Sequence, residues 1–252
     1  MLTQFDGLLW FILTLVPLAL LQRFLHREIQ AVFLIASRSP EFTIVLFSII
    51  FLPGVLLHEF SHYLVAILLG VPAARFSIIP HILPDGRLQL GYVETAKTDI
   101  VRDSLIGAAP LISGGLVVAY LSVTRLDLIP MWDVLRNGQL NLFWLGITLL
   151  PTIPDFPTWF YLIFTISSTM LPSQSDRHGW LPLAGTIAVL LALAALAGVG
   201  PWMLDHLAPI LNTFLRTAAI ILGLSAILHA LFIVPFGILH FTLTRLTGTD
   251  IK

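Results

Sequence analysis

Two imidazoles and a carboxylate lie within five consecutive residues, His58-Glu59-Phe60-Ser61-His62, inside the apolar stretch Phe42–Val71. Residues four apart share one face of an α-helix, so His58 and His62 can offer two nitrogen ligands to one metal ion. Glu59 lies one position round the helix, where its carboxylate can take a proton from a water molecule at that metal. This H-E-x-x-H spacing is typical of zinc peptidases.

The placement of these groups also indicates function. Ionisable side chains are costly in hydrocarbon, so a carboxylate and two histidines in an apolar stretch are expected to serve a site. The structural alternative is a polar contact between two membrane helices, with the H-E-x-x-H spacing arising by chance.

A hydrolytic zinc site needs a third protein ligand and an open position for water. The chain has no cysteine, so this ligand must be a histidine or a carboxylate. If successive apolar stretches cross a membrane in alternation, Asp176 emerges on the side of the membrane nearer to His58 and His62. We therefore expect Asp176 to be the third ligand, with His178 as an alternative.

The composition predicts a polytopic membrane protein. Of the 252 residues, 57% are hydrophobic and only 11% are charged, whereas a soluble domain is about one quarter charged. The net charge of −1 and the absence of a basic run give no support to nucleic-acid binding. We expect one all-α membrane-embedded domain, 1–252, of about six transmembrane helices.

Three parts are expected along this domain. Residues 1–41 form an N-terminal helix and a connection, with the membrane-surface end of the helix and an amphipathic connection in Gln22–Pro40. Residues 42–179 form the core that carries the metal ligands, and residues 180–252 form C-terminal helices. Between the second and third helices, two short segments flank Pro84-Asp85-Gly86-Arg87, whose turn chemistry predicts a small surface β-hairpin.

Prolines and a lone histidine give two further expectations. Prolines interrupt Asn141–Leu171, which predicts a broken helix or a short re-entrant half followed by a span at Phe156–Met170. His229 lies in an apolar stretch, where a single histidine is more often packed and hydrogen-bonded than free to line a cavity.

Residues Phe42–Gly179 resemble the site-2 protease family of intramembrane zinc metalloproteases. His58–His62 matches the first family motif fully, and Ala109-Pro110-Leu111-Ile112-Ser113 resembles the middle motif with Ala for Gly and Ser for Asn. Ser168–Asp176 resembles the last motif, although Arg177 stands where glycine is usual. The resemblance implies a compact, divergent member whose hairpin corresponds to a membrane-associated β element on the cytosolic side.

We therefore expect a zinc-dependent intramembrane endopeptidase that cuts transmembrane segments of other membrane proteins. His58, His62 and Asp176 would hold the zinc, and Glu59 would accept a proton and pass it to the leaving amine. Ser168 and Ser113 are candidate hydrogen-bond donors to the oxyanion or to the unwound substrate.

Two other classes of function fit the sequence less well. A membrane di-iron desaturase or hydroxylase needs several further histidine pairs, whereas the remaining histidines are scattered singly. A transporter or a non-catalytic pseudoprotease is the non-enzymatic alternative.

We expect the protein to lie in a prokaryotic cell membrane. The distribution of basic residues over the two sides of the membrane indicates its orientation there. The hairpin side is expected to carry Arg75, Arg87, Lys97, Arg102, Arg177 and, in the C-terminal tail, Arg245 and Lys252. The other side is expected to carry Arg23, Arg27, Arg38, Arg125 and Arg136. This small excess favours a cytosolic hairpin, with the active site nearer the cytosolic face.

Overall fold

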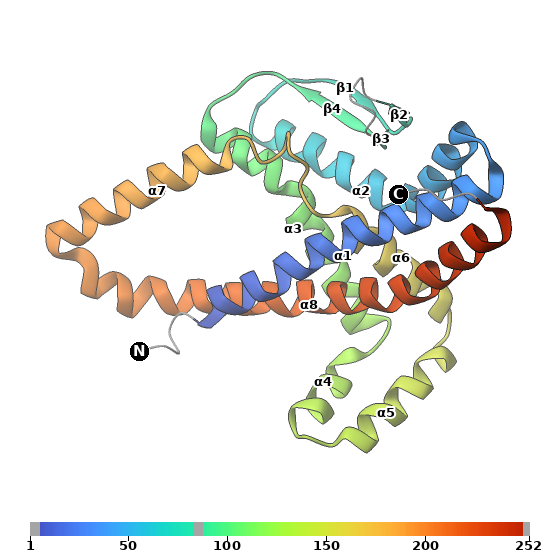
Figure 1. Cartoon of the computed structure of the whole chain (residues 1–252). Coiled ribbons are helices and arrows are strands. Elements are labelled where there is room, and N and C mark those ends of the chain that lie inside the picture. The colour runs from blue at the N-terminus through green and yellow to red at the C-terminus, as the bar shows by residue number, and fades with distance from the viewer. Residues whose placement is uncertain (1–5, 83–87, 249–252) are drawn as a thin grey trace.

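The computed structural model describes residues 6–82 and 88–248, which form a helical protein with one small β-hairpin (Figure 1). The helices are α1 (Asp6–Ser37), α2 (Pro40–Leu68), α3 (Ile100–Thr124), α4 (Leu128–Arg136), α5 (Leu140–Leu149), α6 (Phe156–Thr169), α7 (Trp180–Ala194) and α8 (Gly200–Thr247), with the short turns η2 (Leu150–Thr152) and η3 (Ala195–Val199). The predicted all-α membrane architecture is confirmed.

The number of membrane spans differs from the prediction. Within the described residues, four helical stretches are long and apolar enough to cross a membrane: α1, α2, α3 and the run Trp180–Thr247. The expected number was about six. Helix α6 has only 14 residues, or about 21 Å at 1.5 Å per residue, which is shorter than a hydrocarbon core of about 30 Å.

The run Trp180–Thr247 contains a sharp reversal rather than one straight helix. Gly198, in η3, has φ 83°, a left-handed conformation that glycine adopts without steric cost. Figure 1 shows α7 leading away from the rest of the molecule to this turn and α8 returning from it. The two C-terminal helices expected in residues 180–252 are therefore the two arms of this reversal.

Helix α1 continues to Ser37 and so occupies most of Gln22–Pro40, the segment expected to hold the end of this helix and an amphipathic connection. Leu25, Ile29, Val32 and Ile35 recur at three- and four-residue intervals and are buried. This stripe faces a core that includes Phe47 and Phe51 of α2. Burial of these apolar residues keeps the segment helical although it also carries polar residues, of which Arg23 and Arg27 are exposed and Glu28 is buried.

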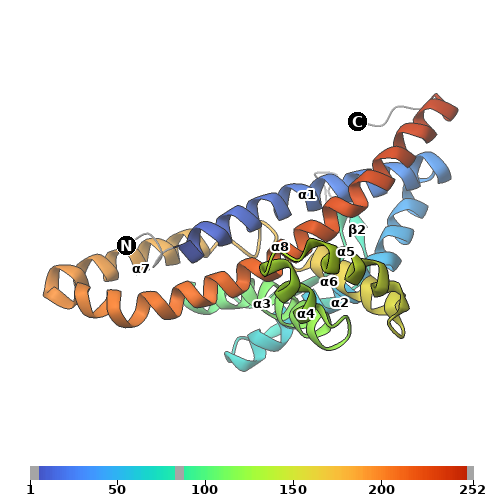
Figure 2. The ribbon, with the colours of Figure 1, turned by 90° about the horizontal axis from the view of Figure 1, so that it is seen from below.

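Helices α1 and α8 lie side by side and run in the same direction (Figures 1 and 2). The Gly7 amide donates to Asn212 Oδ1 at 2.7 Å, and His240 Nδ1 lies 2.6 Å from Glu28 Oε2 further along both helices. The end of α8 therefore lies near the α1–α2 connection, not on the hairpin side. Arg245 therefore lies on the other side from the one expected, and the small basic excess expected on the hairpin side is lost. Arg87 and Lys252 lie outside the described residues.

The centre of the fold is formed by α2 between α3 and α6. At Gly54 of α2, an added Cβ would lie less than 3.0 Å from the carbonyl oxygen of Thr165 in α6. At Gly114 of α3, a Cβ would similarly crowd Met170. These glycines let the helix backbones approach closely, as small residues do in membrane proteins.

The predicted β-hairpin is present between α2 and α3. Strand β1 (Ala73–Ser77) pairs antiparallel with β4 (Tyr92–Thr95), and β2 (His81–Ile82) pairs with β3 (Leu88–Gln89). The predicted turn Pro84-Asp85-Gly86-Arg87 lies outside the described residues. Figure 1 shows the hairpin above α2.

The proline-rich segment Asn141–Leu171 is broken as expected. Helix α5 has 10 residues, η2 contains Pro151, and α6 begins at Phe156 with Pro157 in its first turn. Proline suits the first turn of a helix because its missing N–H would have no intrahelical partner there. The break returns the chain to the centre of the fold as α6.

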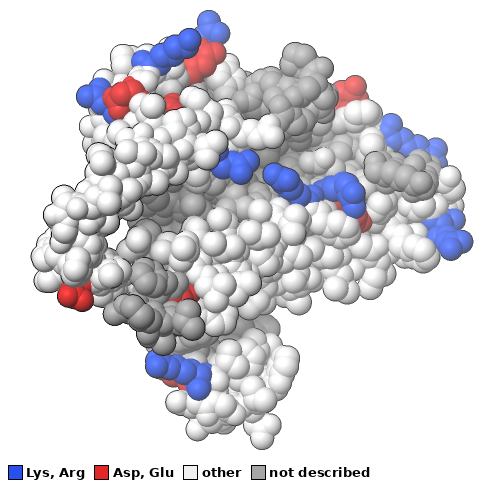
Figure 3. Space-filling model, turned by 60° about the vertical axis from the view of Figure 1, so that its left-hand side comes forward, with Lys and Arg blue, Asp and Glu red and all other residues white. Residues whose placement is uncertain are grey.

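The surface is largely uncharged. Figure 3 shows Lys, Arg, Asp and Glu side chains gathered in a few patches, with wide uncharged areas between them. Large apolar side chains such as Leu181 and Leu196 are more than 80% exposed within the chain. Such a surface suits lipid rather than water.

Candidate metal centre

Three side chains that could ligate a metal converge beside α2. His58 Nε2 and His62 Nε2 lie 3.2 Å apart, and Asp176 from the α6–α7 loop places its carboxylate oxygens 3.7 Å and 3.5 Å from them. In a tetrahedral zinc site with bonds of about 2.0–2.2 Å, neighbouring ligand atoms lie roughly 3.3–3.6 Å apart. The spacing and the donor types, two nitrogens and one oxygen, therefore fit a zinc ion.

The orientation of His58 is set by the end of α6. Its Nδ1 lies 2.6 Å from the carbonyl oxygen of Thr169, the last residue of that helix. A carbonyl only accepts hydrogen bonds, so Nδ1 carries the proton and Nε2 presents a lone pair to the cluster. The last carbonyls of a helix have no intrahelical donor, which leaves this one available.

The orientation of His62 depends on a proline in α3. His62 Nδ1 donates to the carbonyl oxygen of Ile106 at 2.8 Å. In an α-helix this carbonyl would accept from the amide four residues later, but that residue is Pro110, which has no N–H. Both histidines thus use a carbonyl that lacks a helical donor, and both present Nε2 to the cluster.

The loop that carries Asp176 is held against α3. The Ser173 amide donates to Asp176 Oδ2 at 2.7 Å. A Cβ at Gly107 would lie less than 3.0 Å from the Asp176 carbonyl oxygen, so glycine permits this approach. Burial alone would raise the pKa of the Asp176 carboxyl, whereas protonated imidazoles at His58 and His62 would outweigh burial and hold that pKa well below its usual range.

His178, the alternative third ligand, points elsewhere. Its Nε2 lies 3.3 Å from Asp103 Oδ2 at the start of α3, and its side chain is largely exposed. A Cβ at the neighbouring Gly179 would also crowd the Asp103 carboxylate. His178 therefore contacts α3 from the same loop, while Asp176 joins the two histidines.

Glu59 is buried next to the histidines and is covered by the hairpin. Glu59 is only 8% exposed. At Gly91, just before β4, an added Cβ would lie 2.8 Å from Glu59 Cγ and 3.1 Å from Glu59 Oε1. The hairpin backbone thus lies against Glu59 and shields it from solvent.

The two candidate oxyanion donors have other partners. Ser168 is fully buried, and its Oγ lies 3.0 Å from Nε2 of His229 in α8. The Ser113 hydroxyl donates to the Pro110 carbonyl of its own helix at 3.4 Å. His229 is packed and hydrogen-bonded, as the sequence predicted.

Sequence reasoning missed the groups that orient the ligands. These are the backbone carbonyls of Ile106 and Thr169, together with Gly107 and Pro110. A carbonyl leaves no trace in residue type, but a proline inside an apolar helix signals that the carbonyl four residues earlier is free. Applied to Pro110, this rule identifies the carbonyl of Ile106 as free.

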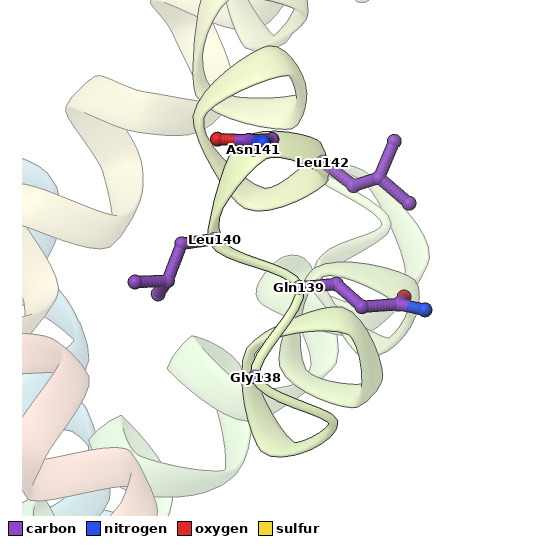
Figure 4. Close-up of a pocket in the computed structure, with 5 residues that line it drawn as sticks. All are labelled: Gly138, Gln139, Leu140, Asn141 and Leu142. Carbon is purple, nitrogen blue, oxygen red and sulfur yellow. The ribbon is translucent and has the colours of Figure 1, made fainter.

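A separate pocket lies at the turn between α4 and α5 (Figure 4). It is lined by Gly138, Gln139, Leu140, Asn141 and Leu142. In Figure 4 the Leu142 and Gln139 side chains extend to one side of the turn and the Leu140 side chain to the other. None of the five lining residues is titratable, so this pocket offers no acid, base or strong metal ligand.

The site therefore consists of three candidate ligands, with a buried glutamate one residue from His58. The ligands come from α2 and from a loop more than a hundred residues later, which α3 and α6 bring together. No family model, curated protein or solved structure matches the chain.

Proposed function

We propose that the chain is a zinc-dependent intramembrane endopeptidase. The proposal is supported by one observation: the side chain of Asp176 meets those of His58 and His62, and these two histidines lie on the same helix as Glu59. Helix α2 is long and apolar enough to cross a membrane, so the site belongs to a membrane-embedded part of the chain. Costly polar groups in such a place favour a functional site.

The residues have separable roles in peptide hydrolysis. When bound, zinc supplies a Lewis acid that polarises the scissile carbonyl and lowers the pKa of a bound water toward about 7. The Glu59 carboxylate accepts the proton as water oxygen attacks the carbonyl carbon. Glu59 then returns that proton to the amide nitrogen, so the C–N bond breaks with a neutral amine as leaving group.

The ligand set favours zinc over a di-iron centre. In residues 6–82 and 88–248 one group of three or more candidate ligands is found, and it contains a single carboxylate. A di-iron site needs more ligands than this. Two imidazoles with one carboxylate match the protein ligands of hydrolytic zinc sites.

The proposed substrate is a transmembrane segment of another membrane protein. A site on a membrane helix is reached from within the bilayer, and a helical segment must unwind before its peptide bond can be attacked. We propose a prokaryotic cell membrane with the hairpin side cytosolic, following the family resemblance.

Cleavage assays on a panel of single-span membrane proteins test this proposal. The purified protein is reconstituted in nanodiscs with each candidate, with and without a zinc chelator. We expect cleavage within or beside the span of at least one candidate, loss of cleavage with the chelator, and recovery on adding zinc. Cleavage that persists without zinc would contradict the mechanism, and a protein that binds zinc but leaves the whole panel intact would support a pseudoprotease.

A further inference from the structure

A buried polar layer joins three helices beside the metal centre. It consists of Gln22 in α1, Ser168 in α6 and His229 in α8. Gln22 Nε2 donates to the Ser168 carbonyl oxygen at 2.6 Å, and Ser168 Oγ lies 3.0 Å from His229 Nε2. Ser168 and His229 are both fully buried, so the contact between them is shielded from water, and Gln22 is partly buried.

The direction of the hydrogen bonds follows from the partners of His229. Its Nδ1 lies 2.7 Å from the Ser225 carbonyl oxygen, which can only accept, so Nδ1 is the donor. The other ring nitrogen then accepts, and the Ser168 hydroxyl donates to it. Each polar atom of the imidazole thus has one defined partner.

The layer meets the metal centre at the last turn of α6. Ser168 directly precedes Thr169, whose carbonyl accepts the proton of His58 Nδ1 at 2.6 Å. Carbonyls in the last turn of a helix lack intrahelical donors. In α6 the last two carbonyls are satisfied from other helices, Ser168 by Gln22 of α1 and Thr169 by His58 of α2.

We propose that Gln22 and His229 are positioning residues for the metal ligand His58. They fix the last turn of α6 from two sides, and this turn holds the carbonyl that aims His58 Nε2 at the cluster. The inference rests on the proposed metal site and assigns a role in it to α1 and α8. Neither helix contributes a ligand.

If Gln22 and His229 only stabilised the fold, their substitution would lower thermal stability without changing zinc affinity. Interhelical hydrogen bonds in membranes stabilise only modestly, so the fold is expected to survive the loss of one of them. Metal affinity responds more strongly, because groups that orient a ligand typically change it by about 10–100-fold. Zinc affinity, compared with thermal stability, therefore separates positioning from general packing.

The test measures zinc affinity by competition with a chromophoric chelator, and the ligand-field absorption of bound Co²⁺, for Gln22→Met and His229→Leu. Both variants are expected to bind zinc about ten-fold more weakly, at the lower end of the range for ligand-orienting groups, and to show an altered Co²⁺ spectrum. His229→Gln keeps an acceptor for Ser168 and is expected to restore most of the affinity.

Asn212→Leu is the matched control. The Asn212 side chain bonds Gly7 and Asp6 at the other end of the same α1–α8 pair. This variant is expected to lower thermal stability and leave zinc affinity unchanged.

The outcomes distinguish this inference from the proposed function. Wild-type protein that binds no zinc would overturn the metal site itself. Wild-type protein that binds zinc, with Gln22→Met and His229→Leu binding it equally well, would overturn only the positioning role. If His229→Leu does not fold, Gln22→Met on a different helix decides the question.

Discussion

The Ile106 carbonyl oxygen accepts a hydrogen bond from His62 Nδ1 at 2.8 Å, across the contact between α3 and α2. The carbonyl has no helical donor, because Pro110 lies four residues later. A proline in the middle of a membrane helix thus serves the orientation of a candidate metal ligand on the neighbouring helix.

The first prediction concerns this proline. Pro110→Ala restores an amide that competes for the Ile106 carbonyl, so zinc affinity is expected to fall by about ten-fold. Thermal stability should be unchanged or higher, because alanine is more favourable than proline in a helix interior. Chelator competition and a thermal melt on the same sample measure both effects. Pro17→Ala in α1 is the control, and an equal change in zinc affinity there would contradict the explanation.

The second prediction concerns the approach of the Asp176 loop. In Gly107→Ala the new Cβ would meet the Asp176 backbone at less than 3.0 Å, so the loop must shift. We expect a loss of zinc affinity of about 10–100-fold. Gly115→Ala on the same helix is the control, because a Cβ there meets no atom within 4 Å among the described residues. Equal zinc affinity in the two variants would show that the contact at Gly107 does not position Asp176.

The third prediction separates Asp176 from His178. Asp176→Ala removes a ligand and is expected to abolish tight zinc binding, whereas His178→Ala removes contacts outside the cluster, with Asp103 and with the Ser175 carbonyl. Zinc content after dialysis of each variant measures the difference. If His178→Ala loses the metal and Asp176→Ala keeps it, the ligand assignment is wrong.

The fourth prediction concerns the general base. Glu59→Gln keeps the shape of the side chain but cannot accept a proton, so zinc is retained while cleavage falls by about 10²–10⁴-fold. The assay compares initial rates on any substrate that the wild-type protein cuts. Wild-type rates in this variant would remove Glu59 from the mechanism.

Local spacing made part of the site predictable. His58, Glu59 and His62 lie on one helix, whose geometry fixes their relation, and the turn chemistry around residue 85 indicated the hairpin. Asp176 needed a topological argument, since it lies far along the chain. Its meeting with the histidines depends on an approach at Gly107 that residue types alone do not reveal.

Long-range packing accounts for what the sequence did not indicate. The partner of Ser168 is His229, 61 residues away, and nothing local links them. The direction of α8 along α1 is fixed by contacts such as Glu28 with His240, which are 212 residues apart. The extent of α1 to Ser37 depended on buried apolar residues that lie among polar residues in the sequence, namely Leu25, Ile29, Val32 and Ile35. In each case tertiary contacts decided between alternatives that local pattern left open.

The most direct test of the account is the metal content of the purified protein, measured by mass spectrometry with and without the two histidines. We expect about one tightly held zinc per wild-type chain and almost none in the folded His58→Ala/His62→Ala variant. Wild-type protein without zinc, or the same zinc content in both proteins, would contradict the proposed metal site.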